Sequence, residues 1–300
     1  MKNNTLKNSM LLLCAAFFWG TTFVSQSVAA DELPTFTYTC VRSIVACVFL
    51  YIIIRVFDKV GKVTNKPVTK ESKRMLLKGG LICGGVLFVA MCLQQYGIGF
   101  TTAGKAGFIT ALYIVIVPVV GIFFGKKTSL FLKIGILFAL VGMYLLCINE
   151  SFSIGKGDLF ILLCSGGFTA HILCVDYFSP KVDGVRLSLL QFAVVAVLCF
   201  VCALIFEEPD IGDILECWGP ILYAGILSSG VAYTLQILAQ KDLNPTIAAI
   251  VMSCESVFSV LAGWIVLGEQ LSRREFFGCL LMLFAIIFSQ LPARKPVKPS

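Results

Sequence analysis

Long apolar stretches recur along the whole chain and constrain its fold more than any other feature. A helix that crosses a bilayer needs about 20 mostly apolar residues. Ten candidate stretches occur, at residues 9–29, 35–57, 79–99, 105–124, 130–148, 158–177, 187–206, 219–239, 246–267 and 276–291. They lack the alternation of barrel strands, and backbone groups in hydrocarbon must bond within their own segment. The sequence therefore predicts an all-α integral membrane protein with ten transmembrane helices.

Composition narrows the function classes. Of 300 residues, 58% are hydrophobic and only 14% are charged, against roughly a quarter charged in soluble domains. Most of the 13 cysteines lie inside apolar stretches and are interpreted as buried packing residues. With one histidine, no metal-ligand cluster is expected, and no GxxxxGK[ST] motif is present to bind ATP phosphates. We expect no metal, no cofactor and no catalytic residues.

Basic residues predict the orientation of the chain. With the N-terminus inside, 19 of the 24 Lys and Arg fall in cytoplasmic segments and 4 fall outside, as the positive-inside rule requires. This split predicts a multi-pass protein of the cell membrane with both termini cytoplasmic. The net charge of +7 is then explained by topology, and no nucleic-acid partner is expected. The first stretch also imitates a signal peptide, but cleavage is disfavoured because it would leave an unpartnered helix.

The chain contains a weak internal repeat. A shift of 143 residues lays 103–148 over 246–291 without a gap, with 8 of 46 positions identical. The match suggests two five-helix halves, 1–148 and 157–291, followed by a cytoplasmic tail at 292–300. Because five is odd, the second half would enter the membrane in the opposite sense. Inverted repeats of this kind are typical of secondary transporters, whose site lies near the midplane between the halves.

Four short motifs in this order resemble a known family. They are Trp19-Gly20-Thr21-Thr22-Phe23, Pro34 followed by Arg42, Phe108-Ile109-Thr110 through Pro118, and Leu267-Gly268-Glu269-Gln270-Leu271-Ser272. Together they resemble the EamA-type members of the drug/metabolite transporter superfamily. The resemblance implies a ten-helix inverted-repeat carrier with a central cavity, frequently an exporter of amino acids or other small metabolites. One departure is Ser256, which stands where many members have proline after the glutamate at Glu255.

An ionisable side chain inside a predicted helix must face protein or a wet cavity because exposure to lipid is costly, and three such residues are candidates for the solute or proton path. Glu255 lies near the middle of its helix, and it would bind a substrate amine, carry a coupling proton or brace two helices. Arg42 would attract an anionic group or orient its helix. His171 lies at a similar depth to Glu255 and would share a proton with it or simply pack.

Neutral polar side chains in the predicted helices provide donors and acceptors without the cost of charge. Their alternative role is hydrogen bonding between helices, which we expect for at least half of them. Trp19 would form an aromatic wall of the cavity. The neutral candidates for the solute path are Gln95, Tyr96, Tyr113 and Gln236, and Gln94, Tyr233 and Gln240 belong to the same class.

These features predict a secondary transporter that moves a small metabolite, an amino acid or a similar amphipathic solute, by alternating access, with export favoured. Its partners would be the small-molecule substrate and the lipid bilayer, and the chain would act as a monomer or a homodimer. The alternative is an integral membrane enzyme or a lipid-handling protein, which would need polar groups gathered at one membrane face. A passive channel would need a ring of repeated polar residues, which two non-equivalent halves do not offer.

Overall fold

A computed structural model describes residues 2–60, 69–101, 103–123, 125, 129–147, 155–267 and 272–289, and in these ranges every regular element is a helix. The tail predicted at 292–300 and residues 268–271 of the last motif lie outside the described ranges. The chain begins with α1 (Lys2–Glu32), α2 (Thr35–Val60) and α3 (Lys70–Ile98). Further along the chain are α7 (Lys156–Phe178) and α8 (Gly184–Phe206), followed by the short α9 (Ile211–Glu216).

Eight helical segments among the described residues are long and apolar enough to cross a membrane. They coincide with eight of the ten stretches predicted from the sequence, which confirms an all-α membrane protein. The other two stretches correspond to α6 (Leu130–Cys147) and α14 (Arg273–Ser289). These contain shorter apolar helices, Leu130–Gly142 and Phe276–Phe288. Ten crossings in an inverted repeat therefore stay a prediction.

Two of the predicted helices are broken near their centres, a feature that the apolar stretches do not reveal. The stretch 105–124 forms α4 (Ala103–Thr110) and α5 (Tyr113–Phe123). The stretch 246–267 forms α12 (Pro245–Met252) and α13 (Glu255–Leu267). Under the 143-residue shift, the gap at 111–112 falls on 254–255, one residue from the gap at 253–254. The breaks thus occupy equivalent places in the two aligned segments.

Local hydrogen bonding accounts for both breaks. Around the first, the amide of Leu112 donates to the carbonyl of Ile109 at 3.2 Å, a tighter turn than an α-helix makes. Pro118 lies four residues beyond Ile114, and its ring and missing N–H disturb the helix there. At the second break no proline is present. Instead the Ser253 hydroxyl donates to the carbonyl of Ile250 at 2.7 Å, and Ser256 donates to that of Ser253 at 2.9 Å, bonds that compete with the helix.

A third irregularity lies in the segment 218–240. It runs from α10 (Trp218–Tyr223) through a nine-residue π-helix, η1 (Ala224–Ala232), into α11 (Tyr233–Gln240). Gly225 and Gly230 allow η1 to approach α2 closely. A Cβ on Gly225 would come within 2.6 Å of Val45, and one on Gly230 within 2.6 Å of Phe49. π-Helical segments are rare and are found frequently at functional sites.

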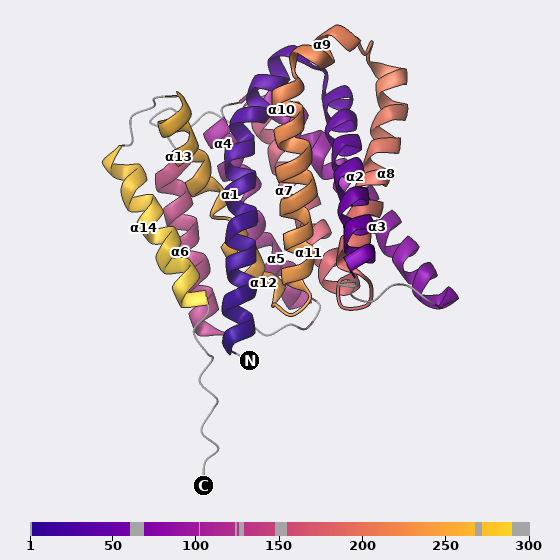
Figure 1. The fold of residues 1–300 in the computed structure, drawn as a ribbon. Helices are drawn as coiled ribbons and strands as arrows, with labels where there is room; N and C mark the ends of the chain where they lie inside the picture. The colour runs from indigo at the N-terminus through magenta and orange to yellow at the C-terminus, as the bar shows by residue number, and fades with distance from the viewer. Residues whose placement is uncertain are drawn as a thin grey trace.

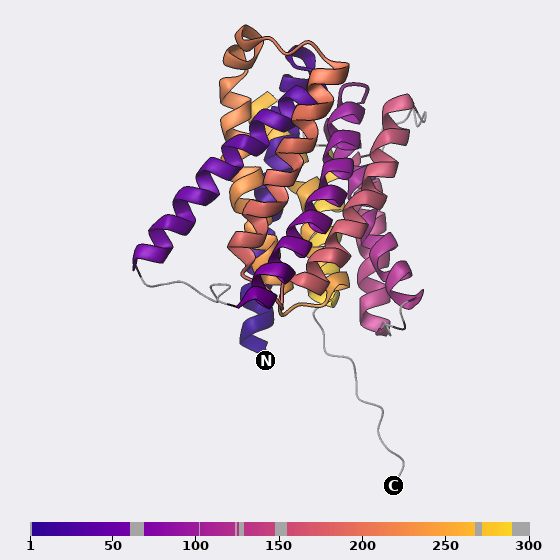
Figure 2. The same cartoon turned by 90° about the vertical axis from the view of Figure 1, so that its right-hand side faces the viewer.

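The helices form one bundle, in which α6 and α14 pair at one side and α2, α3 and α8 lie at the other (Figure 1). α1 begins and α14 ends at the same end of the bundle, and α9 caps the opposite end (Figure 1). The view turned by 90° shows α2 slanting away from the other helices toward its C-terminus (Figure 2). Gly80 and Gly84 of α3 pack on Leu190 and Val194 of α8, so small residues let these two helices approach closely.

Candidate functional site

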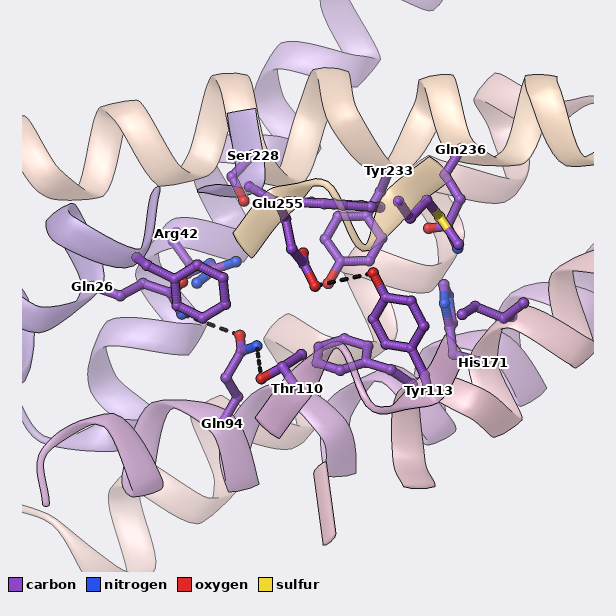
Figure 3. Close-up of a pocket in the computed structure, with 15 residues that line it drawn as sticks. Gln26, Arg42, Gln94, Thr110, Tyr113, His171, Ser228, Tyr233, Gln236 and Glu255 are labelled. Atoms are coloured by element: carbon purple, nitrogen blue, oxygen red, sulfur yellow. Dashed lines mark hydrogen bonds between the residues drawn. The ribbon is translucent and has the colours of Figure 1, made fainter. Parts of the chain in front are cut away.

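The two broken helices and the π-helix border one internal cavity near the middle of the bundle (Figure 3). Its walls come from α1, α2, α3, α7 and α11 in addition to α4, α5, η1, α12 and α13. The cavity measures about 40 Å³, room for a few water molecules at about 10–15 Å³ each. Irregular backbone at membrane depth is tolerated where it is buried in protein or lines such a cavity.

Glu255 provides the acidic group of the cavity. It is the first residue of α13, directly after the break, and only 4% of its surface is exposed. Tyr113, the first residue of α5 after the other break, donates its hydroxyl to Glu255 Oε1 at 3.0 Å (Figure 3). The N-terminus of a helix favours a negative charge, so the start of α13 suits a carboxylate. The two breaks are therefore joined across the cavity by one hydrogen bond.

Arg42 of α2 provides the basic group. Its side chain is 3% exposed, its Nε donates to Ser229 Oγ at 3.3 Å, and its guanidinium lies 5.6 Å from the centre of the Tyr38 ring. Within the described part of the chain, no carboxylate lies within ion-pair distance of Arg42. A buried guanidinium without a counter-ion is costly in a low-dielectric interior.

A chain of amides lies beside Arg42 (Figure 3). Gln26 Nε2 donates to Gln94 Oε1 at 3.4 Å and to Gln95 Oε1 at 3.1 Å. Gln94 in turn donates to Thr110 Oγ1 at 3.3 Å, at the end of α4. This network ties α1, α3 and α4 together and presents Gln26, Gln94 and Thr110 to the cavity.

An aromatic group lies at the other end of the cavity, centred on Tyr233. The Trp19 and His171 rings meet the Tyr233 ring edge-on, with centroid distances of 4.9 and 5.8 Å. His171 Nε2 lies 3.1 Å from Gln191 Oε1, and Gln236 lies one turn beyond Tyr233 in α11. His171 and Glu255 line the same cavity, but the hydrogen-bond partner of the imidazole is Gln191, so the two do not bond directly.

Six of the eight candidates named from the sequence line this cavity: Trp19, Arg42, Tyr113, His171, Gln236 and Glu255. The structure places the other two elsewhere. Gln95 faces α1 and braces it through Gln26, to whose carbonyl it donates at 3.2 Å. Tyr96 lies near the end of the bundle, where its hydroxyl accepts from Lys156 Nζ at 3.0 Å and its ring packs on Phe160.

Sequence reasoning did not select several residues of the cavity. Phe23 and Gln26 follow Trp19 by four and seven residues, a spacing that places all three on one helix face. Once Trp19 was chosen, this spacing could have predicted the other two. Thr110 stands within one of the family-like motifs. Ser228 gave no comparable signal, because it reaches the cavity only through the π-helix. The others are Phe168, Ile172 and Met252, whereas Gln94 and Tyr233 of the lining belong to the neutral polar class named from the sequence.

The profile of a known protein family matches nearly the whole chain. The sequence profile of the EamA-like transporter family matches residues 6–148 and again residues 155–291. The chain belongs to the EamA-like transporter family. Membership identifies it as a multi-pass membrane transporter. The two matches divide the chain close to the place at which the internal repeat divides it.

Relatives of this EamA-like transporter carry general names. An uncharacterized transporter of Archaeoglobus fulgidus is 29% identical over 288 residues, which cover 93% of this chain and 84% of the relative. The uncharacterized transporter YoaV of Bacillus subtilis is 23% identical, with 93% and 94% covered. A crystal structure superposes with a TM-score of 0.77 at 16% identity, covering 96% of this chain and 98% of that one. That likeness concerns the fold alone.

Proposed function

We propose that the protein is a secondary transporter of small zwitterionic metabolites, amino acids or similar amphipathic solutes, and that it works by alternating access in the direction of export. The observation that carries this proposal is the pair of buried, oppositely charged residues Arg42 and Glu255. Both line one cavity, and neither has an oppositely charged partner within the described residues.

A zwitterion would complete both ends of this arrangement. Its carboxylate would pair with the Arg42 guanidinium, which is planar and suited to bidentate binding of carboxylates. Its ammonium group would pair with the Glu255 carboxylate, which has one donor in Tyr113. Because Arg42 and Glu255 are both buried, each pair would form in a low dielectric, where a charge-assisted hydrogen bond is strong. The aromatic rings of Trp19, Phe23 and Phe168 would contact the apolar part of the solute.

Alternating access would require the halves to move against each other. The present cavity of about 40 Å³ must enlarge to admit an amino acid. The breaks at equivalent positions of the two aligned segments support an inverted repeat of two five-helix halves, in which discontinuous helices border the midplane site. Ten crossings, a cytoplasmic location of both termini, placement in the cell membrane and a monomeric or homodimeric state all belong to this proposal.

Counterflow in proteoliposomes tests the proposal. Vesicles containing the purified protein and unlabelled amino acids should take up radiolabelled amino acids faster than vesicles without protein, and the label should be recovered chemically unchanged. Arg42→Gln and Glu255→Gln should each reduce uptake at least about tenfold, since each leaves one charge of the bound solute unpaired. Lys156→Gln is the matched control, because Lys156 bonds Tyr96 outside the cavity.

Two results would contradict the proposal. One is covalent conversion of the solute, which would favour a membrane enzyme. The other is uptake at the wild-type rate in both cavity variants. Direction needs a separate comparison, in which cells with the gene should release more of the solute into the medium than cells without it.

A further inference from the structure

Three side chains that line the cavity carry a buried polar atom with no hydrogen-bond partner within the described residues. The atoms are Trp19 Nε1, His171 Nδ1 and Gln236 Oε1. His171 and Gln236 are each only 1% exposed. Buried polar atoms in native proteins are nearly always satisfied by protein or by ordered water, so an unsatisfied group calls for an explanation. Of nine such atoms among the described residues, these three line one cavity, where a single bound group or water would be able to reach them.

The three residues gather at the end of the cavity away from Arg42. Figure 3 shows His171 and Gln236 beside Tyr233, and Arg42, Gln26 and Gln94 on the far side of Glu255. The Trp19 ring belongs to the same end, because it packs on Tyr233 with a centroid distance of 4.9 Å. The charged pair proposed to hold a zwitterion therefore leaves this second polar group unused.

The hydrogen-bonding roles of these atoms define what would fit. The indole Nε1 of Trp19 only donates, and the amide oxygen of Gln236 only accepts. His171 Nε2 faces the oxygen of Gln191 at 3.1 Å, so in the neutral imidazole Nε2 donates and Nδ1 is the acceptor. A group that satisfies all three atoms must donate to His171 Nδ1 and to Gln236 Oε1 and accept from Trp19 Nε1. A carboxamide has the two donor hydrogens and the acceptor oxygen, a hydroxyl has the acceptor and one of the two donors, and an aliphatic side chain has neither.

We propose that Trp19, His171 and Gln236 form a specificity subsite for a neutral hydroxyl or carboxamide group at the end of the solute remote from its charges. The proposal rests on the function proposed above and narrows it, from amphipathic zwitterions in general to those with a polar side chain. A site that must hydrogen-bond its substrate discriminates strongly against an isostere that lacks the bonding group, because its own buried atoms are then left unpaired.

Isosteric pairs of amino acids test the subsite. The probes are threonine against valine and asparagine against leucine, each offered unlabelled as a competitor of counterflow in the proteoliposomes described above. The wild-type protein should be inhibited by threonine and asparagine at concentrations at least about tenfold lower than by valine and leucine. Gln236→Met should reduce this preference several-fold by weakening inhibition by threonine and asparagine, and a thermal unfolding transition like that of the wild-type protein shows that the variant is folded.

Gln240→Met is the matched control. Gln240 is a buried glutamine one turn further along α11, which donates to the carbonyl of Ile172 at 3.4 Å and does not line the cavity. This variant should keep the wild-type preference.

Equal inhibition by both members of each pair would overturn the subsite and leave the transport proposal standing, as expected if ordered water satisfies the three atoms. A preference that survives in Gln236→Met would also overturn it. Failure of all four amino acids to compete would defeat both proposals.

Discussion

At Gly20, α1 lies very close to the broken helix that carries Glu255, and replacing this glycine with alanine should separate the two helices. A Cβ at this position would lie 2.5 Å from the carbonyl oxygen of Glu255, 2.6 Å from the Cβ of Phe258 and 2.9 Å from the amide nitrogen of Ser259. Two of these atoms belong to the backbone and cannot rotate away. The helices must therefore shift apart to restore ordinary contact distances.

The magnitude follows from a comparison with a second glycine. Gly166, in α7, is exposed on the bundle surface, and a Cβ there would meet nothing within 4 Å. Both substitutions remove the same entropic disadvantage of glycine in a helix, about 1 kcal/mol, so their difference isolates the clash. Overpacking costs typically about 1–3 kcal/mol. We therefore expect Gly20→Ala to be less stable than Gly166→Ala by that amount.

Thermal unfolding of the two variants in detergent measures this difference. By the scaling of soluble proteins of comparable size, about 1–3 kcal/mol corresponds to a melting temperature lower by roughly 2–12 °C. In the counterflow assay, unlabelled amino acids should also inhibit Gly20→Ala only at higher concentrations than they inhibit the wild-type protein. The reason is that the displaced carbonyl belongs to Glu255. If both variants melted at the same temperature, α1 and α13 would not be in the close contact described, and the placement of Glu255 beside α1 would be wrong.

Two further predictions concern residues outside the cavity. The Glu207 carboxylate accepts from the backbone amides of Phe36 and Thr37 at 2.8 and 2.7 Å, capping α2 from α8, so Glu207→Gln should lower the free energy of unfolding by about 0.5–2 kcal/mol. Chemical denaturation should show no such loss for the neighbouring Glu208→Gln. Tyr96→Phe should leave counterflow uptake at the wild-type rate, and a large loss would mean that Tyr96 does contact the solute.

The sequence predicted the spans well because hydropathy is summed over about 20 residues, so single exceptions hardly change the result. It did not predict the breaks, because each depends on a few local hydrogen bonds. Pro118 was a visible signal for the first. At the second, the absence of proline at Ser256 removed the expected signal, and the serine hydroxyls that replace it are common in unbroken helices as well.

The choice between neighbouring polar residues could not be made from the sequence either. Gln94 and Gln95 differ by about 100° in direction around α3, and one lines the cavity while the other braces α1. Both are buried, so the rotation of the helix follows from its contacts with α7 and α8 and not from its own pattern. Charge was a better guide, because a buried ion must face a polar site wherever its helix is placed.

The three irregular segments explain why the cavity lies where it does. The break before α5 positions Tyr113, the break before α13 positions Glu255, and the π-helix η1 positions Ser228, and all three residues line the same space. An unbroken α-helix bonds its backbone groups internally, so it would offer only side chains to the cavity, in directions set by the helical repeat. Departures from α-helical bonding free backbone groups and reorient side chains, and they also supply the joints about which half-helices can tilt. In this chain the breaks that place Glu255 and Tyr113 in the cavity are therefore also the points about which the proposed movement would occur.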